Sequence, residues 1–326
     1  MDFESSTLGK LLSDSRIGPI AGDAIRNRDL SREPLWEKTL IQLKEEGIFS
    51  CGIDSGFERL YRAADTDEWY YPLYSEAECV LEPSRRGVSI VWFPSDSSGA
   101  CEKPFILLVP GGGFVNVWNL TEGWPVAAQF NSLGYHVFIL TYQVDGREKL
   151  LEKNMEDFAR ALTFIGEHRE RFELKNTRYI TCGFSAGGYL VCLWNTKMGY
   201  ARHALEKPEA VFPIYPVTSL REQMKYDRND IQSALRLYGF PIEEAAKLDY
   251  EIPEHADGFP PCALFLAAGD ELVDPIHSKL LAAALDRLGI PCRLEIGPEG
   301  GHGFADGTGM CMAGWTRRAA DWYESL

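Results

Sequence analysis

Short apolar runs alternate with amphipathic stretches along most of the chain from about residue 76 onward. Continuous apolar runs of this kind are typical of parallel strands covered on both faces, and apolar positions at helical spacing predict helices between them. The alternation predicts an α/β fold with a mostly parallel, doubly wound sheet and flanking helices. The expected strands are 76–81, 88–93, 105–109, 135–140, 179–182, 210–215, 263–268 and 292–296, and the expected helices are 124–133, 149–168, 187–197, 275–288 and 314–323.

The beginning of the chain follows a different pattern, which predicts only helices. Leu8, Leu11 and Leu12 have the i, i+3, i+4 spacing of one helix face. A longer helix is expected over 31–47 and a short amphipathic one over 53–61. The apolar and aromatic side chains of these helices are expected to pack against the rest of the chain.

These two patterns divide the chain near residue 75. We interpret residues 1–75 as an N-terminal helical extension and residues 76–326 as the main α/β domain. Within that domain, residues 217–258 interrupt the rhythm of strands and helices, because they are polar and contain Pro241 and Pro253. A long irregular insertion between two strands predicts a lid or cap.

A candidate nucleophile stands between an expected strand and an expected helix, in the sequence Gly183-Phe184-Ser185-Ala186-Gly187. This G-x-S-x-G pattern in that context is typical of a nucleophile elbow. Its glycines permit a turn too tight for side chains, and the turn projects the serine oxygen at a helix N-terminus. A plain strand-to-helix turn is the alternative.

A serine hydroxyl needs a base, and His302 is the best candidate among the six histidines. It lies in the flexible sequence Gly300-Gly301-His302-Gly303, after the last expected strand and before the last helix. His136 lies in an expected strand, and His168 and His203 lie in charged helical surroundings. A structural or surface role is the simpler interpretation for each of these three.

The candidate acid is Asp270, which follows the strand expected over 263–268. Glu271 and Asp274 compete for this role, but Asp274 directly precedes Pro275 and is typical of a helix cap. The resulting order along the chain is serine, aspartate, histidine, which is the order expected of an α/β-hydrolase.

A glycine-rich loop after another strand, Pro110-Gly111-Gly112-Gly113-Phe114, predicts an oxyanion hole. Its backbone N–H groups, together with that of Ala186, could converge on one oxygen atom. A phosphate site is the alternative for such a loop, but neither G-K-[ST] nor G-x-G-x-x-G is present. Four aromatic residues could line the pocket, although core packing is the simpler interpretation for each: Phe114, Trp118, Tyr142 and Trp194.

Composition narrows the classes of function further. The chain of 326 residues has a formal net charge of −15 and no extended basic patch, which excludes nucleic acid as an expected partner. No apolar run approaches the length of a membrane span, and the acidic N-terminus does not read as a secretory signal. The eight cysteines form no C-x-x-C pair, so we expect reduced thiols in a cytoplasmic protein and no metal site.

Taken together, these motifs resemble the α/β-hydrolase superfamily, and within it the acetyl esterase and acetylxylan-esterase-like group. The resemblance covers roughly residues 80–326 and rests on the glycine-rich loop, the segment 121–127, the elbow, the segment 270–275 and 302–304. Many relatives carry histidine where this chain has Pro110, a departure that points away from the hormone-sensitive-lipase-like branch. Residues 1–75 resemble no family that we recognise.

The resemblance implies that Ser185, Asp270 and His302 form a catalytic triad. It implies Gly112, Gly113 and Ala186 as oxyanion donors. The implied activity is that of a serine carboxylesterase, which hydrolyses short-chain, acetyl esters through an acyl-enzyme without any cofactor. Its small-molecule ester substrates would include acetylated sugars or xylo-oligosaccharides.

Two other functions remain open on the sequence. One is a serine peptidase of the prolyl-oligopeptidase type, although 75 residues are too few for the propeller that such enzymes carry. The other is a non-catalytic ligand-binding protein on a hydrolase scaffold, although such proteins usually lack a triad member. A homodimer paired through the apolar N-terminal helices is a further alternative to their packing on the same chain.

Overall fold

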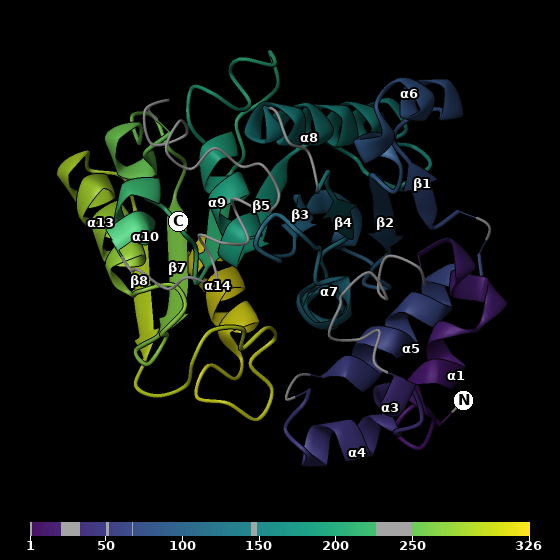
Figure 1. Cartoon of the computed structure of the whole chain (residues 1–326). Coiled ribbons are helices and arrows are strands. Elements are labelled where there is room, and N and C mark those ends of the chain that lie inside the picture. The colour runs from purple at the N-terminus through teal and green to yellow at the C-terminus, as the bar shows by residue number, and fades with distance from the viewer. Residues whose placement is uncertain (1, 21–32, 50–51, 67, 145–148, 226–249) are drawn as a thin grey trace.

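The computed structural model describes residues 2–20, 33–49, 52–66, 68–144, 149–225 and 250–326. Its centre is an eight-stranded sheet in the order β1-β2-β4-β3-β5-β6-β7-β8 (Figure 1). Strand β2 runs antiparallel to both of its neighbours, and every pair from β4 to β8 is parallel. The strands are β1 (Tyr70–Pro72), β2 (Ser89–Phe93), β3 (Phe105–Val109), β4 (Val137–Thr141), β5 (Tyr179–Phe184), β6 (Ala210–Ile214), β7 (Cys262–Ala267) and β8 (Cys292–Gly297).

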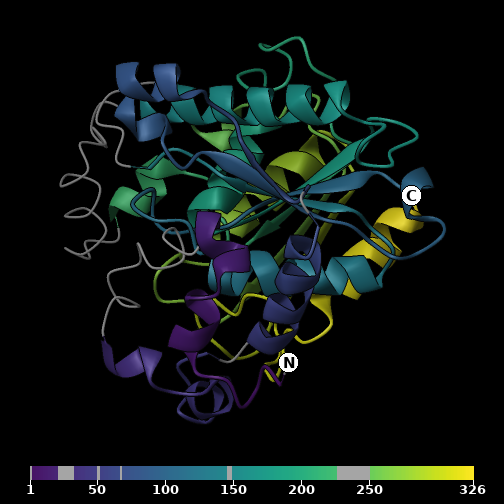
Figure 2. The ribbon, with the colours of Figure 1, turned by 90° about the vertical axis from the view of Figure 1, so that its right-hand side faces the viewer.

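Two layers of helices cover the sheet. Figure 2 shows α8 on one side and α7, α14 and the N-terminal helices on the other. Side chains alternate along each strand, so in β3 Phe105, Leu107 and Val109 join one core while Ile106 and Leu108 join the other. The principal helices are α7 (Trp124–Ser132), α8 (Leu150–Glu167), α9 (Ser185–Trp194), α13 (Ile276–Arg287) and α14 (Trp315–Glu324). Among the described residues, no helix is long and apolar enough to cross a membrane.

The N-terminal helices are built into this core. Helices α1 (Leu8–Leu12), α3 (Glu33–Trp36), α4 (Leu40–Glu45) and α5 (Ile53–Ala64) lie beside α7 and the β2 side of the sheet. Phe57 of α5 packs edge-on against Trp124 of α7, with ring centroids 5.3 Å apart. The Tyr61 hydroxyl donates to the carbonyl of Leu11. Residues assigned to the extension therefore share one apolar core with the main domain and contribute its first strand, β1.

Two expectations for local structure are wrong. Residues 76–81 form helix α6 (Glu76–Leu81) instead of a strand, because Ser75 and Glu78 make a capping box that starts a helix. The single helix expected over 31–47 is divided into α3 and α4, and Thr39 caps the second part with its own capping box.

The insertion expected at 217–258 lies largely outside the described residues. Helix α10 (Leu220–Lys225) is described at its start and a 3₁₀ turn (Ile252–Glu254) near its end. The N–H of Ile252 donates to the carbonyl of Thr218, so the two ends of the insertion meet. The lid or cap stays a prediction.

Candidate functional site

Ser185 lies at the sharp turn from β5 into α9, with a φ of +51°. Such a value is strained for a residue with a side chain, and it follows from how closely the chain folds on itself here. A Cβ atom on Gly183 would lie 2.4 Å from the carbonyl oxygen of Gly187. One on Gly187 would lie 2.2 Å from the carbonyl oxygen of Val109. Gly183 is therefore required by its packing against α9, and Gly187 by its packing against the end of β3.

Three side chains from distant parts of the sequence meet above this turn. Nε2 of His302 lies 2.9 Å from Oγ of Ser185, and Nδ1 lies 2.7 Å from Oδ2 of Asp270. The other oxygen of Asp270 accepts the backbone N–H groups of Leu272 and Val273, at 3.0 and 2.9 Å. These bonds fix the orientation of the carboxylate, so one oxygen faces the imidazole. The arrangement fits a ring that carries its proton on Nδ1 and accepts the serine proton on Nε2.

Asp274, which competes with Asp270 for the role of acid, has a different position. Its Oδ1 accepts the N–H of Ile276 at 2.7 Å. It therefore caps the start of α13, as its place before Pro275 predicts. The Asp270 carboxylate is fully buried, whereas the His302 side chain keeps 16% of its surface exposed. The imidazole can therefore contact both the buried acid and a substrate.

The glycine-rich loop follows β3 beside Ser185. Gly112 and Gly113 have φ values of +135° and +61°, which glycine adopts readily. Among the described residues, no hydrogen bond is donated by the N–H of either glycine. The N–H of Ala186 belongs to the first turn of α9, where it has no partner within the helix. The three donors could therefore bind an oxyanion next to Ser185.

Comparison with known protein families identifies the family of this chain. The sequence model of the family BD-FAE matches residues 91–285, which is more than half of the chain. The chain belongs to the BD-FAE family. The matched segment carries the glycine-rich loop, the elbow with Ser185, and Asp270, whereas His302 lies beyond it.

Two curated relatives align with this BD-FAE chain. Endo-1,4-beta-xylanase B of Butyrivibrio fibrisolvens is 27% identical over 224 residues, which are 66% of this chain and 34% of the relative. The acetylxylan esterase of Xylanibacter ruminicola is 24% identical over 235 residues, which are 70% of this chain and 46% of the relative. The chain thus spans less than half the length of either relative.

Solved structures share the fold. An acetyl ester-xyloside bifunctional hydrolase of Caldicellulosiruptor lactoaceticus has a TM-score of 0.64 at 27% identity, covering 78% of this chain and 95% of its own. A carboxylesterase of Lactobacillus plantarum has a TM-score of 0.60 at 21% identity, covering 73% and 92%. The expected α/β-hydrolase fold is confirmed, and so is the resemblance to esterases of this fold.

The BD-FAE chain contains a buried carboxylate, Glu122, whose role the sequence analysis did not predict, although it lies in the segment 121–127. Its Oε2 accepts the N–H of Gly111 at 2.6 Å, and its Oε1 accepts the hydroxyl of Tyr215 at 2.8 Å. The Tyr215 hydroxyl in turn accepts the N–H of Ala305, three residues after His302. Burial raises the pKa of Glu122. Its two hydrogen bonds and the nearby His302 oppose this upward shift. Glu122 therefore links the glycine-rich loop to the histidine loop and removes the Gly111 N–H as an oxyanion donor.

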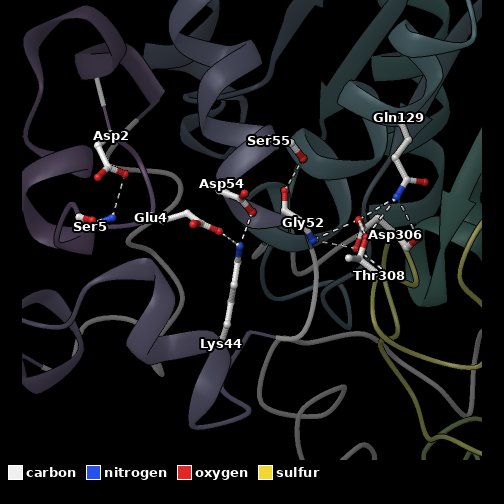
Figure 3. A network of polar contacts seen from close by, with 10 residues as sticks. All are labelled: Asp2, Glu4, Ser5, Lys44, Gly52, Asp54, Ser55, Gln129, Asp306 and Thr308. Atoms are coloured by element: carbon white, nitrogen blue, oxygen red, sulfur yellow. Dashed lines mark hydrogen bonds and ion pairs between the residues drawn. The ribbon is translucent and has the colours of Figure 1, made fainter.

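A second buried carboxylate, Asp306, holds the histidine loop from another side. It accepts the N–H of Gly52 at 3.1 Å and Nε2 of Gln129 at 2.8 Å, and it also accepts the hydroxyl of Thr308 (Figure 3). Gly52 precedes α5, and Gln129 lies on α7. Burial raises the pKa of Asp306, while its hydrogen bonds oppose the shift. The N-terminal extension is thus bonded directly to the loop that carries His302.

Further polar contacts lie within the N-terminal extension, next to the hydrogen bonds of Asp306. Nζ of Lys44 lies 2.5 Å from Oδ1 of Asp54 and 3.3 Å from Oε1 of Glu4. Figure 3 shows these residues beside the Asp306 cluster, together with Asp2 and Ser5. Lys44, Asp54 and Asp306 line a shared cavity of about 490 Å³. Among the described residues, no group of three or more His, Cys, Asp or Glu side chains could hold a metal ion.

The four aromatic pocket candidates separate into different environments. The buried indole of Trp194 donates to the hydroxyl of Tyr179 at the start of β5, whereas Ser185 follows the end of that strand, so the structure does not bring Trp194 to Ser185. Tyr142 is buried and donates its hydroxyl to Pro110 of the glycine-rich loop. Phe114 is buried beside Tyr189, and Trp118 is half-buried. A role in substrate binding stays a prediction for Phe114, Trp118 and Tyr142.

Proposed function

We propose that this chain is a serine carboxylesterase that hydrolyses short-chain, acetyl esters of sugars or xylo-oligosaccharides through an acyl-enzyme. The observation that carries the proposal is the chain of two hydrogen bonds from Asp270 through His302 to Ser185, at a strained elbow. Hydrolysis of an ester requires such an activated hydroxyl beside donors for the developing negative charge.

The reaction begins when Oγ of Ser185 attacks the ester carbonyl carbon and Nε2 of His302 takes the hydroxyl proton. Asp270 accepts a hydrogen bond from Nδ1 and stabilises the imidazolium that forms. The negative charge on the carbonyl oxygen is held by the N–H groups of Gly112, Gly113 and Ala186. Removal of one such donor typically raises the barrier by about 3 kcal/mol.

The tetrahedral intermediate then collapses and the ester C–O bond breaks. His302 returns its proton to the leaving alcohol, and the acyl group stays on Ser185. A water molecule, deprotonated by His302, attacks this acyl-enzyme in the same geometry and releases the acid. The chain's own residues supply every group that this sequence of steps uses.

The relatives support the choice of substrate. One curated relative is named an acetylxylan esterase, and the solved structure at 27% identity is named an acetyl ester-xyloside hydrolase. These names favour acetyl esters on xylose-based sugars over peptides. No name among the reported relatives favours the peptidase alternative.

The test is a hydrolysis panel of p-nitrophenyl acetate, butyrate and octanoate, acetylated xylo-oligosaccharides and an aminoacyl p-nitroanilide. We expect the highest kcat/KM among the p-nitrophenyl esters for acetate, turnover of the sugar acetates, and none of the anilide. Ser185→Ala is expected to lower kcat by about 10³-fold or more, whereas Ser325→Ala, an exposed serine near the C-terminus, leaves it unchanged. Undiminished activity in Ser185→Ala, or turnover of the anilide alone, would overturn the proposal.

A further inference from the structure

A second cavity lies beside the glycine-rich loop, above the ends of β2 and β4. Its volume is about 450 Å³. One wall is the turn that precedes β2 and another is the segment that follows β4, while Asn116 and Val117 close the side toward the glycine-rich loop. The residues that the argument uses are Glu82, Arg86, Val88, Asn116, Val117 and Thr141.

Two buried polar side chains open into this cavity with hydrogen-bonding capacity to spare. Asn116 is 9% exposed, and its side-chain amide has no hydrogen-bond partner among the described residues. Thr141 is 7% exposed, and its oxygen accepts from Nδ2 of Asn119 at 2.9 Å. Within the described ranges, no acceptor receives the Thr141 hydroxyl proton. The Asn116 amide and the Thr141 hydroxyl can therefore form further hydrogen bonds to a ligand or to water in the cavity.

The cavity is close enough to Ser185 for one substrate to reach both. A Cβ on Gly111 would lie 2.9 Å from Cβ of Ser185, and a Cβ on Gly112 would lie 2.1 Å from the carbonyl oxygen of Asn116. Because consecutive Cα atoms are 3.8 Å apart, the Asn116 carbonyl lies no more than about 12 Å from the Ser185 side chain. A short oligosaccharide spans this distance.

The lining selects a neutral ligand that both donates and accepts hydrogen bonds. Glu82 forms an ion pair with Lys153, and Arg86 forms one with Glu76. Neither charged group of the lining is therefore left to pair with an ionic ligand. The amide of Asn116 offers donors and an acceptor, and the Thr141 hydroxyl offers a donor. Val88 and Val117 add apolar surface. Sugar rings match this combination, because they carry hydroxyl groups around apolar C–H faces.

We propose that this cavity binds sugar units of the alcohol half of the ester, with Asn116 and Thr141 as specificity-determining residues. The inference rests on the proposed esterase function, since it takes Ser185 as the point of attachment of the acyl group. It adds a place for the leaving group: the acetyl ester lies at Ser185, and the sugar chain extends past Gly112 toward β2 and β4. Tyr142, which lines the cavity and bonds to Pro110, connects the two sites.

A kinetic comparison of two substrates with one acyl group tests the proposal. Wild type, Asn116→Ala and Thr141→Val are assayed on acetylated xylotriose and on p-nitrophenyl acetate, which has no sugar. We expect kcat/KM for the sugar acetate to fall about tenfold in Asn116→Ala and about threefold in Thr141→Val, from lost hydrogen bonds. Values for p-nitrophenyl acetate should change less than about twofold. Asn176→Ala, near the start of β5 at the opposite edge of the sheet, serves as the control and should change neither.

A binding measurement separates this proposal from the esterase proposal. Xylotriose is titrated into Ser185→Ala protein, and into the same protein carrying Asn116→Ala, by calorimetry. We expect binding that the second substitution weakens about tenfold. Equal kinetic losses on both substrates, unchanged kinetics on the sugar acetate, or binding that ignores Asn116 would overturn the sugar site while leaving the esterase intact. Binding that depends on Asn116, without hydrolysis of any ester by wild type, would retain the sugar site and refute the esterase.

Discussion

Two members of the proposed triad differ in exposure from the buried polar groups around them. Ser185 and His302 are partly open to solvent, so they can meet a substrate. Glu122, Asp306 and His277 are buried, and each accepts backbone N–H groups from a neighbouring segment. In the proposed function, Ser185 and His302 transfer protons, whereas Glu122 and Asp306 hold the segments that carry the reacting groups.

The largest effect is expected within the triad. Asp270→Asn should lower kcat by about 10⁴-fold, because an amide next to Nδ1 disfavours the ring tautomer that can take the serine proton. Asp274→Asn keeps a side-chain oxygen that can still accept the N–H of Ile276, so kcat should change less than about twofold. Both variants are to be compared with wild type in steady-state hydrolysis of p-nitrophenyl acetate. A greater loss in Asp274→Asn would transfer the role of acid to that residue.

A smaller effect is expected when the support of the glycine-rich loop is broken. Glu122→Ala leaves the Gly111 N–H and the Tyr215 hydroxyl without their acceptor, so the oxyanion donors move and kcat should fall about 100-fold. Glu122→Gln keeps an oxygen for Gly111 and should recover part of this loss. Glu58→Ala, an exposed glutamate of α5, is the matched control. If Gln and Ala variants both retain wild-type kcat, then Glu122 has no influence on the reacting groups.

Loss of the Asp306 hydrogen bonds should lower the free energy of unfolding more than it lowers catalytic activity. Asp306→Ala leaves buried donors on Gly52 and Gln129 unsatisfied, which typically costs about 2 kcal/mol of the free energy of unfolding. Activity should fall only severalfold, because His302 keeps its contact with Asp270. Asp54→Ala, which breaks a partly exposed ion pair with Lys44, should cost less than about 1 kcal/mol. Urea unfolding measures the free energy of unfolding of both variants. Equal losses in the two variants would show that Asp306 does not hold the histidine loop.

The smallest effect concerns His277, whose Nδ1 accepts the N–H groups of Thr218 and Ser219. Burial lowers the pKa of His277 to about 4, although Asp274 and Glu222 oppose the shift. Below pH 6.5 the unfolded chain therefore binds a proton that the folded protein refuses, and the free energy of unfolding falls as the pH drops. Between pH 6.5 and 5.5 this linkage removes about 1 kcal/mol.

His277→Gln eliminates this titration, so its free energy of unfolding should fall less than that of wild type over the same pH interval. The measurement is urea unfolding of both proteins at pH 6.5 and 5.5. The slope is the relevant quantity, because the substitution also lowers stability at every pH by loosening Thr218 and Ser219. Identical slopes would show that His277 is not held neutral by burial.

The sequence predicted the parts of the site that local patterns encode. A tight turn allows only glycine at 183 and 187, and apolar runs mark most of the strands. Asp274 was separated from Asp270 because a cap before proline has its own signature. Another local pattern, the capping box of Ser75 and Glu78, predicts a helix instead of a strand over residues 76–81.

The buried supports escaped prediction because their partners are distant in sequence. Asp306 bonds to Gly52, 254 residues away, and Glu122 bonds to Tyr215, 93 residues away. Nothing local separates such a carboxylate from a solvated one, except that Glu122 is the single charged residue of the segment 117–125. Trp194 lies away from Ser185 because a ten-residue helix carries its last side chain far from its first.

The central claim is that Ser185 is the nucleophile, and covalent labelling tests it most directly. The protein is treated with a fluorophosphonate, and the modified residue is located by mass spectrometry of its peptides. We predict a single adduct on Ser185, with hydrolysis of p-nitrophenyl acetate lost in proportion to labelling and neither adduct nor activity in Ser185→Ala. An adduct on another residue, or full labelling of Ser185 with activity intact, would contradict the account.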